Sequence, residues 1–147
     1  MKVLLVEDDY VQEDTITEAL ERAFTGIKVD KIRTEAEFHE GIDRIASKPP
    51  DVVIMDVMLR WTDPAPDMPI PPPVVQNDGY HRAGLRCVDM LSKRDATKNV
   101  PVILFTVLRR EDLELSNTDN SILYVSKESE LDELVSRIRN VVRREHA

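Results

Sequence analysis

The segment Asp51-Val52-Val53-Ile54-Met55-Asp56 contains four consecutive apolar residues between two aspartates. Such a short run, rich in branched side chains, is typical of a strand that is buried on both faces. A second run of this kind, Val3-Leu4-Leu5-Val6, stands near the start of the chain and ends at Glu7-Asp8-Asp9. The sequence therefore predicts two buried strands, each followed directly by carboxylates.

Three more strands and five helices are predicted around these two runs. Residues 27–32 alternate polar and apolar side chains, which indicates a strand at the sheet edge. Apolar runs predict the other strands at 100–105 and 122–125. Helical periodicity predicts helices at 11–24, between Thr34 and Pro49, at 79–94, at 109–115 and at 129–144. Thr34 and Glu37 form a capping-box pattern, and Gly26 is expected to be a helix C-cap.

The alternation of strands and helices predicts an α/β fold, a doubly wound, five-stranded parallel sheet with helices on both faces. In such sheets the ligand site lies beyond the carboxyl ends of the strands. The residues that follow the predicted strands carry carboxylate, hydroxyl and ammonium groups; they are Glu7, Asp8, Asp9, Asp56, Thr106 and Lys127. We therefore expect the functional site at this edge of the sheet.

These groups together suit phosphoryl transfer. Converging carboxylates repel one another unless a cation or proton intervenes, and Mg²⁺ prefers such oxygen ligands. The carboxylate of Asp56 could attack phosphorus and form an acyl phosphate. Lys127 would supply a positive charge to a phosphate oxygen, and the hydroxyl of Thr106 would donate a hydrogen bond to another.

The chain resembles the receiver domain of two-component response regulators over essentially its whole length. The segments that carry the resemblance are Leu4-Leu5-Val6-Glu7-Asp8-Asp9, Val53-Ile54-Met55-Asp56, Pro101-Val102-Ile103-Leu104-Phe105-Thr106 and Tyr124-Val125-Ser126-Lys127. The resemblance implies a flavodoxin-like (βα)5 fold with strand order 2-1-3-4-5. It also implies that Asp56 accepts a phosphoryl group from a phosphohistidine of a sensor histidine kinase or a histidine phosphotransfer protein.

Further roles are implied by the same resemblance. Mg²⁺ (or Mn²⁺) would be bound by Asp8, Asp56 and the backbone carbonyl of Met58, with Glu7 acting through water and Asp9 outside the ligand set. Thr106 would move toward the phosphoryl group, and the rotamer of Tyr124 would follow. The protein would then catalyse only its own phosphorylation and dephosphorylation, and it would control a downstream protein partner or relay the phosphate.

A long insertion separates this sequence from the usual receiver pattern. The family places a short loop between the phosphorylated aspartate and the next helix, whereas here residues 60–77 intervene. Six of the nine prolines lie between Pro64 and Pro73, so the segment is expected to be extended and stiff. Two interpretations stand side by side: a passive surface excursion, or a segment anchored by Trp61 that shields the site or selects partners.

Two single positions also depart from the family. Val107 follows Thr106 where Ala or Gly is usual, so we expect narrower access to Asp56 and slow labelling by small phosphodonors. Glu128 follows Lys127 where the family has Pro, usually in a cis bond. The Lys127–Glu128 bond is therefore either trans with Lys127 shifted, or cis under strain.

Composition argues against several other classes of protein. The net charge of −8 disfavours nucleic-acid binding and attachment to an anionic membrane surface. No apolar run reaches the length of a membrane span and no signal peptide is evident, so a cytoplasmic protein is expected. Cys87 is the only cysteine and is expected to be inert, and His39, His81 and His146 lack metal-like spacing, as surface histidines would.

Residues 1–147 are expected to form a single receiver domain whose output is its phosphorylation state, either complete in itself or part of a longer regulator. Two alternatives remain open at this point. One is a receiver-like binding module that takes no phosphate, which Val107, Glu128 and the insertion favour. The other is a metal-dependent phosphatase with an aspartyl nucleophile, although Met58 occupies the position where such enzymes carry a second acid.

Overall fold

The computed structural model describes all residues except 64–66, 68–69, 114–121 and 146–147. Its centre is a sheet of five parallel strands in the order β2-β1-β3-β4-β5. The strands are β1 (Lys2–Val6), β2 (Lys28–Ile32), β3 (Val52–Met55), β4 (Val102–Thr106) and β5 (Ile122–Ser126). Both the doubly wound fold and the predicted strand order are confirmed, and β2 lies at the edge as expected.

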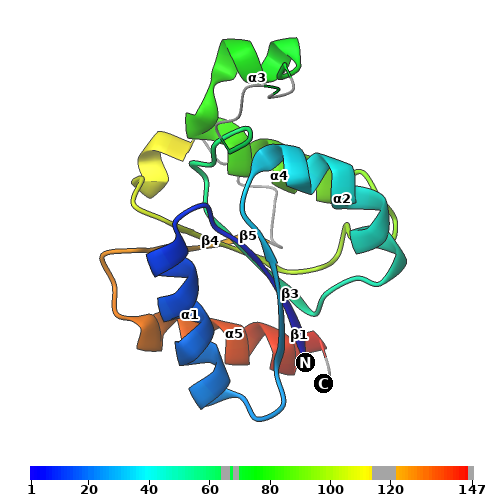
Figure 1. Ribbon diagram of the computed structural model, residues 1–147. Helices are drawn as coiled ribbons and strands as arrows, with labels where there is room; N and C mark the ends of the chain where they lie inside the picture. The colour runs from blue at the N-terminus through cyan, green and yellow to red at the C-terminus, as the bar shows by residue number, and fades with distance from the viewer. Residues whose placement is uncertain (64–66, 68–69, 114–121, 146–147) are drawn as a thin grey trace.

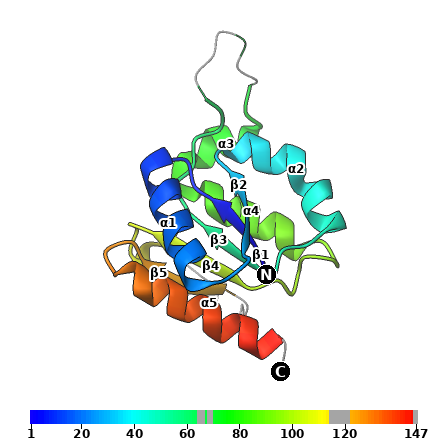
Figure 2. The ribbon, with the colours of Figure 1, turned by 60° about the horizontal axis from the view of Figure 1, so that its bottom comes forward.

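Helices cover both faces of the sheet (Figure 1). α1 (Tyr10–Ala23) and α5 (Leu131–Glu145) lie together on one face, and α2 (Glu35–Ser47) and α4 (Ala83–Ser92) lie on the other. Figure 2 shows the same two layers after rotation of the molecule. No helix within the described part of the chain combines the length and apolar character that a membrane crossing requires.

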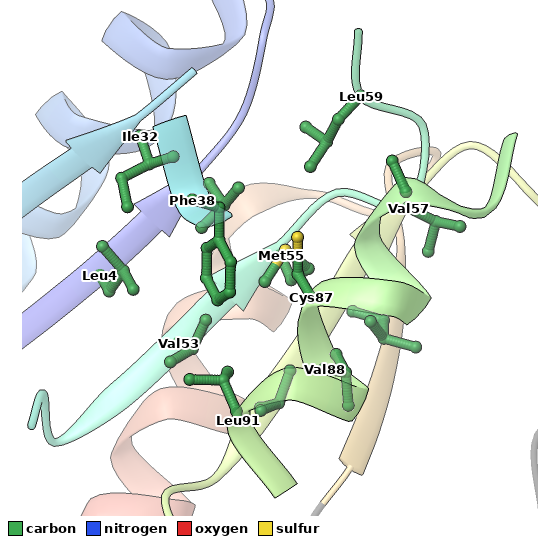
Figure 3. Close-up of a cluster of buried hydrophobic side chains, with 14 of the residues drawn as sticks. Leu4, Ile32, Phe38, Val53, Met55, Val57, Leu59, Cys87, Val88 and Leu91 are labelled. Atoms are coloured by element: carbon green, nitrogen blue, oxygen red, sulfur yellow. The ribbon is translucent and has the colours of Figure 1, made fainter. Parts of the chain in front are cut away.

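Each face of the sheet has its own apolar core. On the α2–α4 face, Phe38 of α2 packs with Leu4 of β1, Val53 of β3 and Leu91 of α4 (Figure 3). Val57 and Leu59 are also fully buried in this cluster. The core therefore continues past the end of β3 and fixes the residues that follow Asp56 in the sequence.

The capping predictions are confirmed at the start of α2 and wrong at the end of α1. Thr34 caps α2, where the Glu37 N–H donates to Thr34 Oγ1 at 3.1 Å, as the capping-box pattern predicts. α1 ends earlier than expected, at Ala23 with Phe24 as its cap. Gly26 is therefore not the C-cap; it lies in the following turn with φ of 73°. A positive φ is a conformation that glycine adopts without a steric cost.

The predicted helix at 79–94 is wrong at its start. The structure has α3 (Pro73–Asp78), a 3₁₀ turn at Tyr80–Arg82, and then α4 from Ala83. Gly79 separates these elements, and its φ of 75° is incompatible with a continuous right-handed helix. Apolar periodicity alone does not show this interruption.

The insertion also differs from the expected extended segment. Its last part is helical, and Pro73 stands in the first turn of α3, where a missing N–H is tolerated. The prolines at 64, 66 and 69 lie outside the described residues. The short helix predicted at 109–115 is a 3₁₀ turn at Arg110–Leu113, and positions 114 and 115 are outside the described part.

Candidate functional site

The parallel register brings the strand-end residues to one edge of the sheet. Val6 pairs with Met55, so Glu7 and Asp56 emerge side by side from β1 and β3. The Asp56 N–H donates to the Val6 carbonyl at 3.0 Å, and the Lys127 N–H donates to the Thr106 carbonyl at 2.9 Å. Backbone hydrogen bonds thus fix where these residues leave the sheet.

Lys127 joins two buried carboxylates. Its Nζ donates to Glu7 Oε1 at 2.7 Å and to Asp56 Oδ2 at 2.9 Å. Glu7 is 2% exposed and Asp56 6% exposed, so both acids are nearly removed from water. The structure therefore brings together three of the residues that the sequence predicted at this edge.

Burial and neighbouring charges shift the pKa values of Glu7 and Lys127. Burial, together with the neighbouring charge and hydrogen bond of Asp56, raises the pKa of Glu7 to about 8, although Lys127 acts in the opposite direction. Burial lowers the pKa of Lys127, but the two carboxylates outweigh it and the net shift is upward. Lys127 is thus held as a cation, which suits the binding of an anion at the site.

The acidic residues can offer a cation a compact set of oxygens. Glu7, Asp8 and Asp56 each provide a carboxylate oxygen within 4.8 Å of the others, a donor set that fits Mg²⁺. Asp9 points elsewhere, since its Oδ1 accepts the Val11 N–H at 2.9 Å and the Gln12 N–H at 3.2 Å as the N-cap of α1. The expectation that Asp9 lies outside the set agrees with this arrangement.

Met58 contacts the site through its backbone. Its N–H donates to Asp56 Oδ1 at 3.3 Å, so the two carboxylate oxygens of Asp56 have different partners. This bond orients the carboxylate. The ligand role expected of the Met58 carbonyl stays a prediction.

Thr106 and Tyr124 both bind Leu108. Thr106 is fully buried, and its Oγ1 accepts the Leu108 N–H at 3.3 Å. The hydroxyl of half-buried Tyr124 donates to the Leu108 carbonyl at 2.6 Å. One peptide segment therefore connects the two expected switch residues, and nothing in the sequence pattern around Leu108 pointed to it.

Glu128 and Val107, the two positions that depart from the receiver pattern, both lie next to residues of the site. No peptide bond in the described ranges is cis, so the Lys127–Glu128 bond is trans, and Lys127 nonetheless reaches both carboxylates. Val107 is 55% exposed directly after Thr106. Its effect on access stays a prediction.

The start of the insertion is attached to the site and to α2. The Arg60 N–H donates to Asp8 Oδ2 at 3.1 Å, a contact that the sequence did not reveal. The carbonyls of Arg60 and Trp61 accept the N–H groups of Glu35 and Ala36, each at 2.9 Å. The Trp61 ring also packs edge-on against His39, with ring centroids 5.2 Å apart. Trp61 thus attaches the start of the insertion to α2, as one of the two interpretations supposed, and a role of the insertion in shielding the site or selecting partners stays a prediction.

His39 is not the free surface residue that its sequence context indicates. Its Nε2 lies 3.0 Å from Glu35 Oε2, and the side chain is 26% exposed. Glu35, His39 and Cys87 could together hold a metal ion by geometry. However, Arg86 already binds both oxygens of Glu35, at 2.6 and 2.8 Å, and burial raises the pKa of the Cys87 thiol well above its ordinary value. The centre of this cluster is therefore a buried ion pair, and the burial of Cys87 agrees with the expectation that its thiol is inert, which stays a prediction.

No family model matches the sequence, and no curated protein matches it. Solved structures do. The chain is 23% identical to the receiver domain of a Francisella response regulator, with 98% of each chain covered and a TM-score of 0.67. It is 15% identical to a signal receiver domain of a two-component histidine kinase from Clostridium thermocellum, with 96% of each chain covered and a TM-score of 0.72.

A third structure bears on the metal. It is the receiver domain of a sensor histidine kinase from Pseudomonas aeruginosa PAO1, described with a magnesium ion coordinated in its active-site cleft. This chain is 18% identical to it, with 96% of each chain covered and a TM-score of 0.67. At these levels of identity the likeness concerns the fold: the chain has the fold of response regulator receiver domains.

Proposed function

We propose that this protein is a receiver whose Asp56 accepts a phosphoryl group, with Mg²⁺ or Mn²⁺ held by Asp8, Asp56 and the Met58 carbonyl and contacted by Glu7 through water. The observation that carries the proposal is the contact of Lys127 with both Asp56 and Glu7 at the ends of three parallel strands. A carboxylate, an acidic cluster and a buried ammonium converge there, in a fold shared with receiver domains. A bound divalent cation would neutralise charge on the transferred group.

In the transfer step, an Asp56 carboxylate oxygen attacks the phosphorus of a phosphohistidine on a partner kinase or phosphotransfer protein. A P–O bond forms and the P–N bond breaks, and the electron pair stays on the imidazole nitrogen, which then takes a proton. The Met58 N–H orients the attacking carboxylate through its bond to Oδ1. Lys127 leaves its bridging position and binds a phosphoryl oxygen as a point charge.

The conformational response would pass through Leu108. The hydroxyl of Thr106 turns toward the new phosphoryl oxygens and no longer accepts the hydrogen bond from the Leu108 N–H. Leu108 is then less firmly positioned, which weakens the hydrogen bond from the Tyr124 hydroxyl to the Leu108 carbonyl. A change at Tyr124 would then alter the surface that a downstream protein binds. In NMR spectra the Leu108 amide signal should shift on phosphorylation of the wild type, and a Thr106→Ala variant should abolish most of that shift.

The central test is intact-mass analysis after incubation with Mg²⁺ and a phosphodonor, either acetyl phosphate or a phosphorylated histidine kinase. The wild type should gain one phosphoryl mass, and Asp56→Asn should gain none. Asp9→Asn is the matched control: it changes a carboxylate at the same edge, and asparagine caps a helix as well as aspartate does, so it should be labelled normally.

Failure of the wild type to gain mass from both donors would overturn the proposal in favour of a binding module that takes no phosphate. Repeated turnover of a small phosphate ester would instead favour the phosphatase alternative. Labelling of Asp56→Asn at the wild-type level would show that Asp56 is not the acceptor.

A further inference from the structure

Arg60 contacts Asp8 at three points. Its backbone N–H donates to Asp8 Oδ2 at 3.1 Å, its Nε lies 3.6 Å from the same oxygen, and its Nη2 donates to the Asp8 backbone carbonyl at 3.3 Å. Nη1 also lies 3.4 Å from Asp63 Oδ1. The guanidinium group therefore lies beside one of the three carboxylates that could hold a divalent cation.

The backbone that carries Arg60 is held from three sides. Leu59 is fully buried, and its N–H donates to the Tyr80 carbonyl at 3.2 Å. The carbonyls of Arg60 and Trp61 accept the first N–H groups of α2. Hydrogen bonds of this kind use the free N–H groups at a helix start and fix the chain there. The Arg60 N–H is thus firmly aimed at Asp8, whereas the side chain, 43% exposed, can turn into solvent.

We propose that Arg60 is a built-in counter-cation of Asp8 that a divalent cation must displace, and that it lowers the metal affinity of the site. The inference rests on the proposed function only in assigning Asp8 as a metal ligand. Mg²⁺ binds carboxylate oxygens at about 2.0–2.1 Å. An ion at Asp8 would bring two positive charges close to the guanidinium, which must then leave.

The contact is built by the insertion, so it links the insertion to the chemistry of the site. Arg60 is the first residue of the insertion at 60–77, and Trp61 follows it and packs against His39. Metal binding releases the Arg60 side chain from Asp8, while the backbone bonds to α2 remain. Arg60 is accordingly a residue that sets metal affinity by positioning charge, without itself binding the phosphoryl group.

The competing interpretation is an ordinary surface ion pair with no influence on the metal. Partly exposed pairs of this type typically contribute little to stability. Stability alone therefore does not separate the two interpretations, whereas direct binding of the metal does.

The test is isothermal titration calorimetry, in which Mg²⁺ is titrated into the full chain with no phosphodonor present. Arg60→Ala should bind Mg²⁺ about two- to fivefold more tightly than the wild type, the effect expected on losing one charge–charge contact beside a partly exposed carboxylate. Arg22→Ala is the control. It removes the same charge from the exposed last turn of α1, at the end of that helix away from Asp8.

A second pair of variants isolates the Arg60–Asp8 contact. In an Asp8→Asn background, which weakens the metal site itself, adding Arg60→Ala should leave the remaining Mg²⁺ affinity unchanged. A thermal melt of each variant verifies folding, which the exposure of the Arg60 side chain favours.

Equal Mg²⁺ affinity of the wild type and Arg60→Ala would overturn the role of Arg60 and leave phosphorylation of Asp56 intact. The same gain in affinity for Arg22→Ala would also overturn it, because overall charge would then be the cause. If neither the wild type nor Arg60→Ala binds Mg²⁺ saturably, the metal site at Asp8 is overturned as well. Phosphorylation of Asp56 is tested separately, by intact-mass analysis.

Discussion

Lys127 and Asp56 are 71 positions apart in the sequence, and in the folded chain Lys127 Nζ lies 2.9 Å from Asp56 Oδ2. The same ammonium lies 2.7 Å from Glu7. Lys127 therefore has two roles: it stabilises the folded edge of the sheet, and it is positioned to bind a phosphoryl oxygen. Each role leads to a measurable expectation.

Replacing Lys127 by Met should destabilise the fold. The substitution keeps the approximate shape but leaves Glu7 and Asp56 buried without their shared cation. Loss of one partner of a buried ion pair costs about 3 kcal/mol. Urea denaturation near neutral pH would measure the loss in the free energy of unfolding. Lys93→Met is the control, because the Lys93 side chain is 72% exposed. Equal stabilities of the two variants would contradict the structural role of Lys127.

Replacing Glu7 by Gln should stabilise the protein more at high pH than at low pH. The folded pKa of Glu7, about 8, lies above the ordinary value of 4.5. The folded state therefore keeps a proton that the unfolded state releases, and wild-type stability falls as pH rises through this window. A neutral Gln removes that dependence.

Thermal melts with a chelator present, at several pH values between about 5 and 8, would test this expectation. At the upper end of this pH range, the melting temperature of Glu7→Gln should exceed that of the wild type by several degrees. For a chain of this size, such a shift corresponds to about 1–2 kcal/mol in the free energy of unfolding. Exposed Glu21→Gln is the control. A difference that does not change with pH would contradict the raised pKa.

Gly84 should be irreplaceable, because α4 begins against the backbone of Asp56. A Cβ on Gly84 would overlap the Asp56 carbonyl oxygen and lie 2.7 Å from Val57 Cα. Gly84→Ala should therefore cost about 3 kcal/mol by overpacking and slow labelling of Asp56. Chemical denaturation and intact-mass kinetics would measure the two effects.

Gly41→Ala provides the matched comparison within α2. Its Cβ would meet only the flexible end of Arg44, at 3.2 Å from Nη2. Alanine is the better helix former by up to about 1 kcal/mol, so this variant should be as stable as the wild type or more so. Similar losses for both glycines would show that the close approach at Gly84 is not the cause.

Replacing Glu35 by Gln should destabilise the α2–α4 packing in a pH-dependent way. Burial raises the pKa of Glu35, but its bonds to Arg86 and His39 outweigh this and the net shift is downward. The ion pair therefore stabilises the fold above the ordinary pKa of 4.5, and its contribution is lost as pH falls through the lower folded pKa.

At neutral pH the loss for Glu35→Gln should be about 3 kcal/mol, since the guanidinium of Arg86 would remain largely buried without its carboxylate. The gap to the wild type should narrow below about pH 4.5 in denaturation experiments. Exposed Glu40→Gln, on the same helix, is the control. A gap of constant size across the acidic range would contradict the lowered pKa.

Replacing Val107 by Ala should speed labelling of Asp56 by acetyl phosphate by a few fold. Val107 is exposed next to Thr106, where a branched side chain restricts a small donor approaching the site. Intact-mass time courses would give the rates, with half-exposed Val74→Ala on α3 as control. Rapid saturation of the wild type by acetyl phosphate would count against any restriction.

Much of the fold and of the site could be predicted from sequence because both depend on local patterns. Apolar runs of four or five residues mark buried strands, and parallel strands bring their carboxyl ends to one edge. Glu7, Asp56 and Lys127 could thus be grouped before any contact was known. The N-cap at Thr34 and the edge position of β2 followed in the same way.

Other features depend on contacts between segments that no local pattern encodes. The helix break at Gly79 results from a positive φ within an otherwise periodic stretch. The binding of Thr106 and Tyr124 to Leu108, and of Arg86 to Glu35, depends on how the chain returns to the sheet.

Local sequence patterns specify which groups meet at the edge of the sheet, since the carboxyl ends of parallel strands all lie at that edge. What surrounds those groups depends on contacts between segments that are distant in the sequence. Arg60 reaches Asp8 because buried Leu59 and the start of α2 direct the chain there after β3. The path of a long connection is set by such packing and hydrogen bonds, not by its own composition.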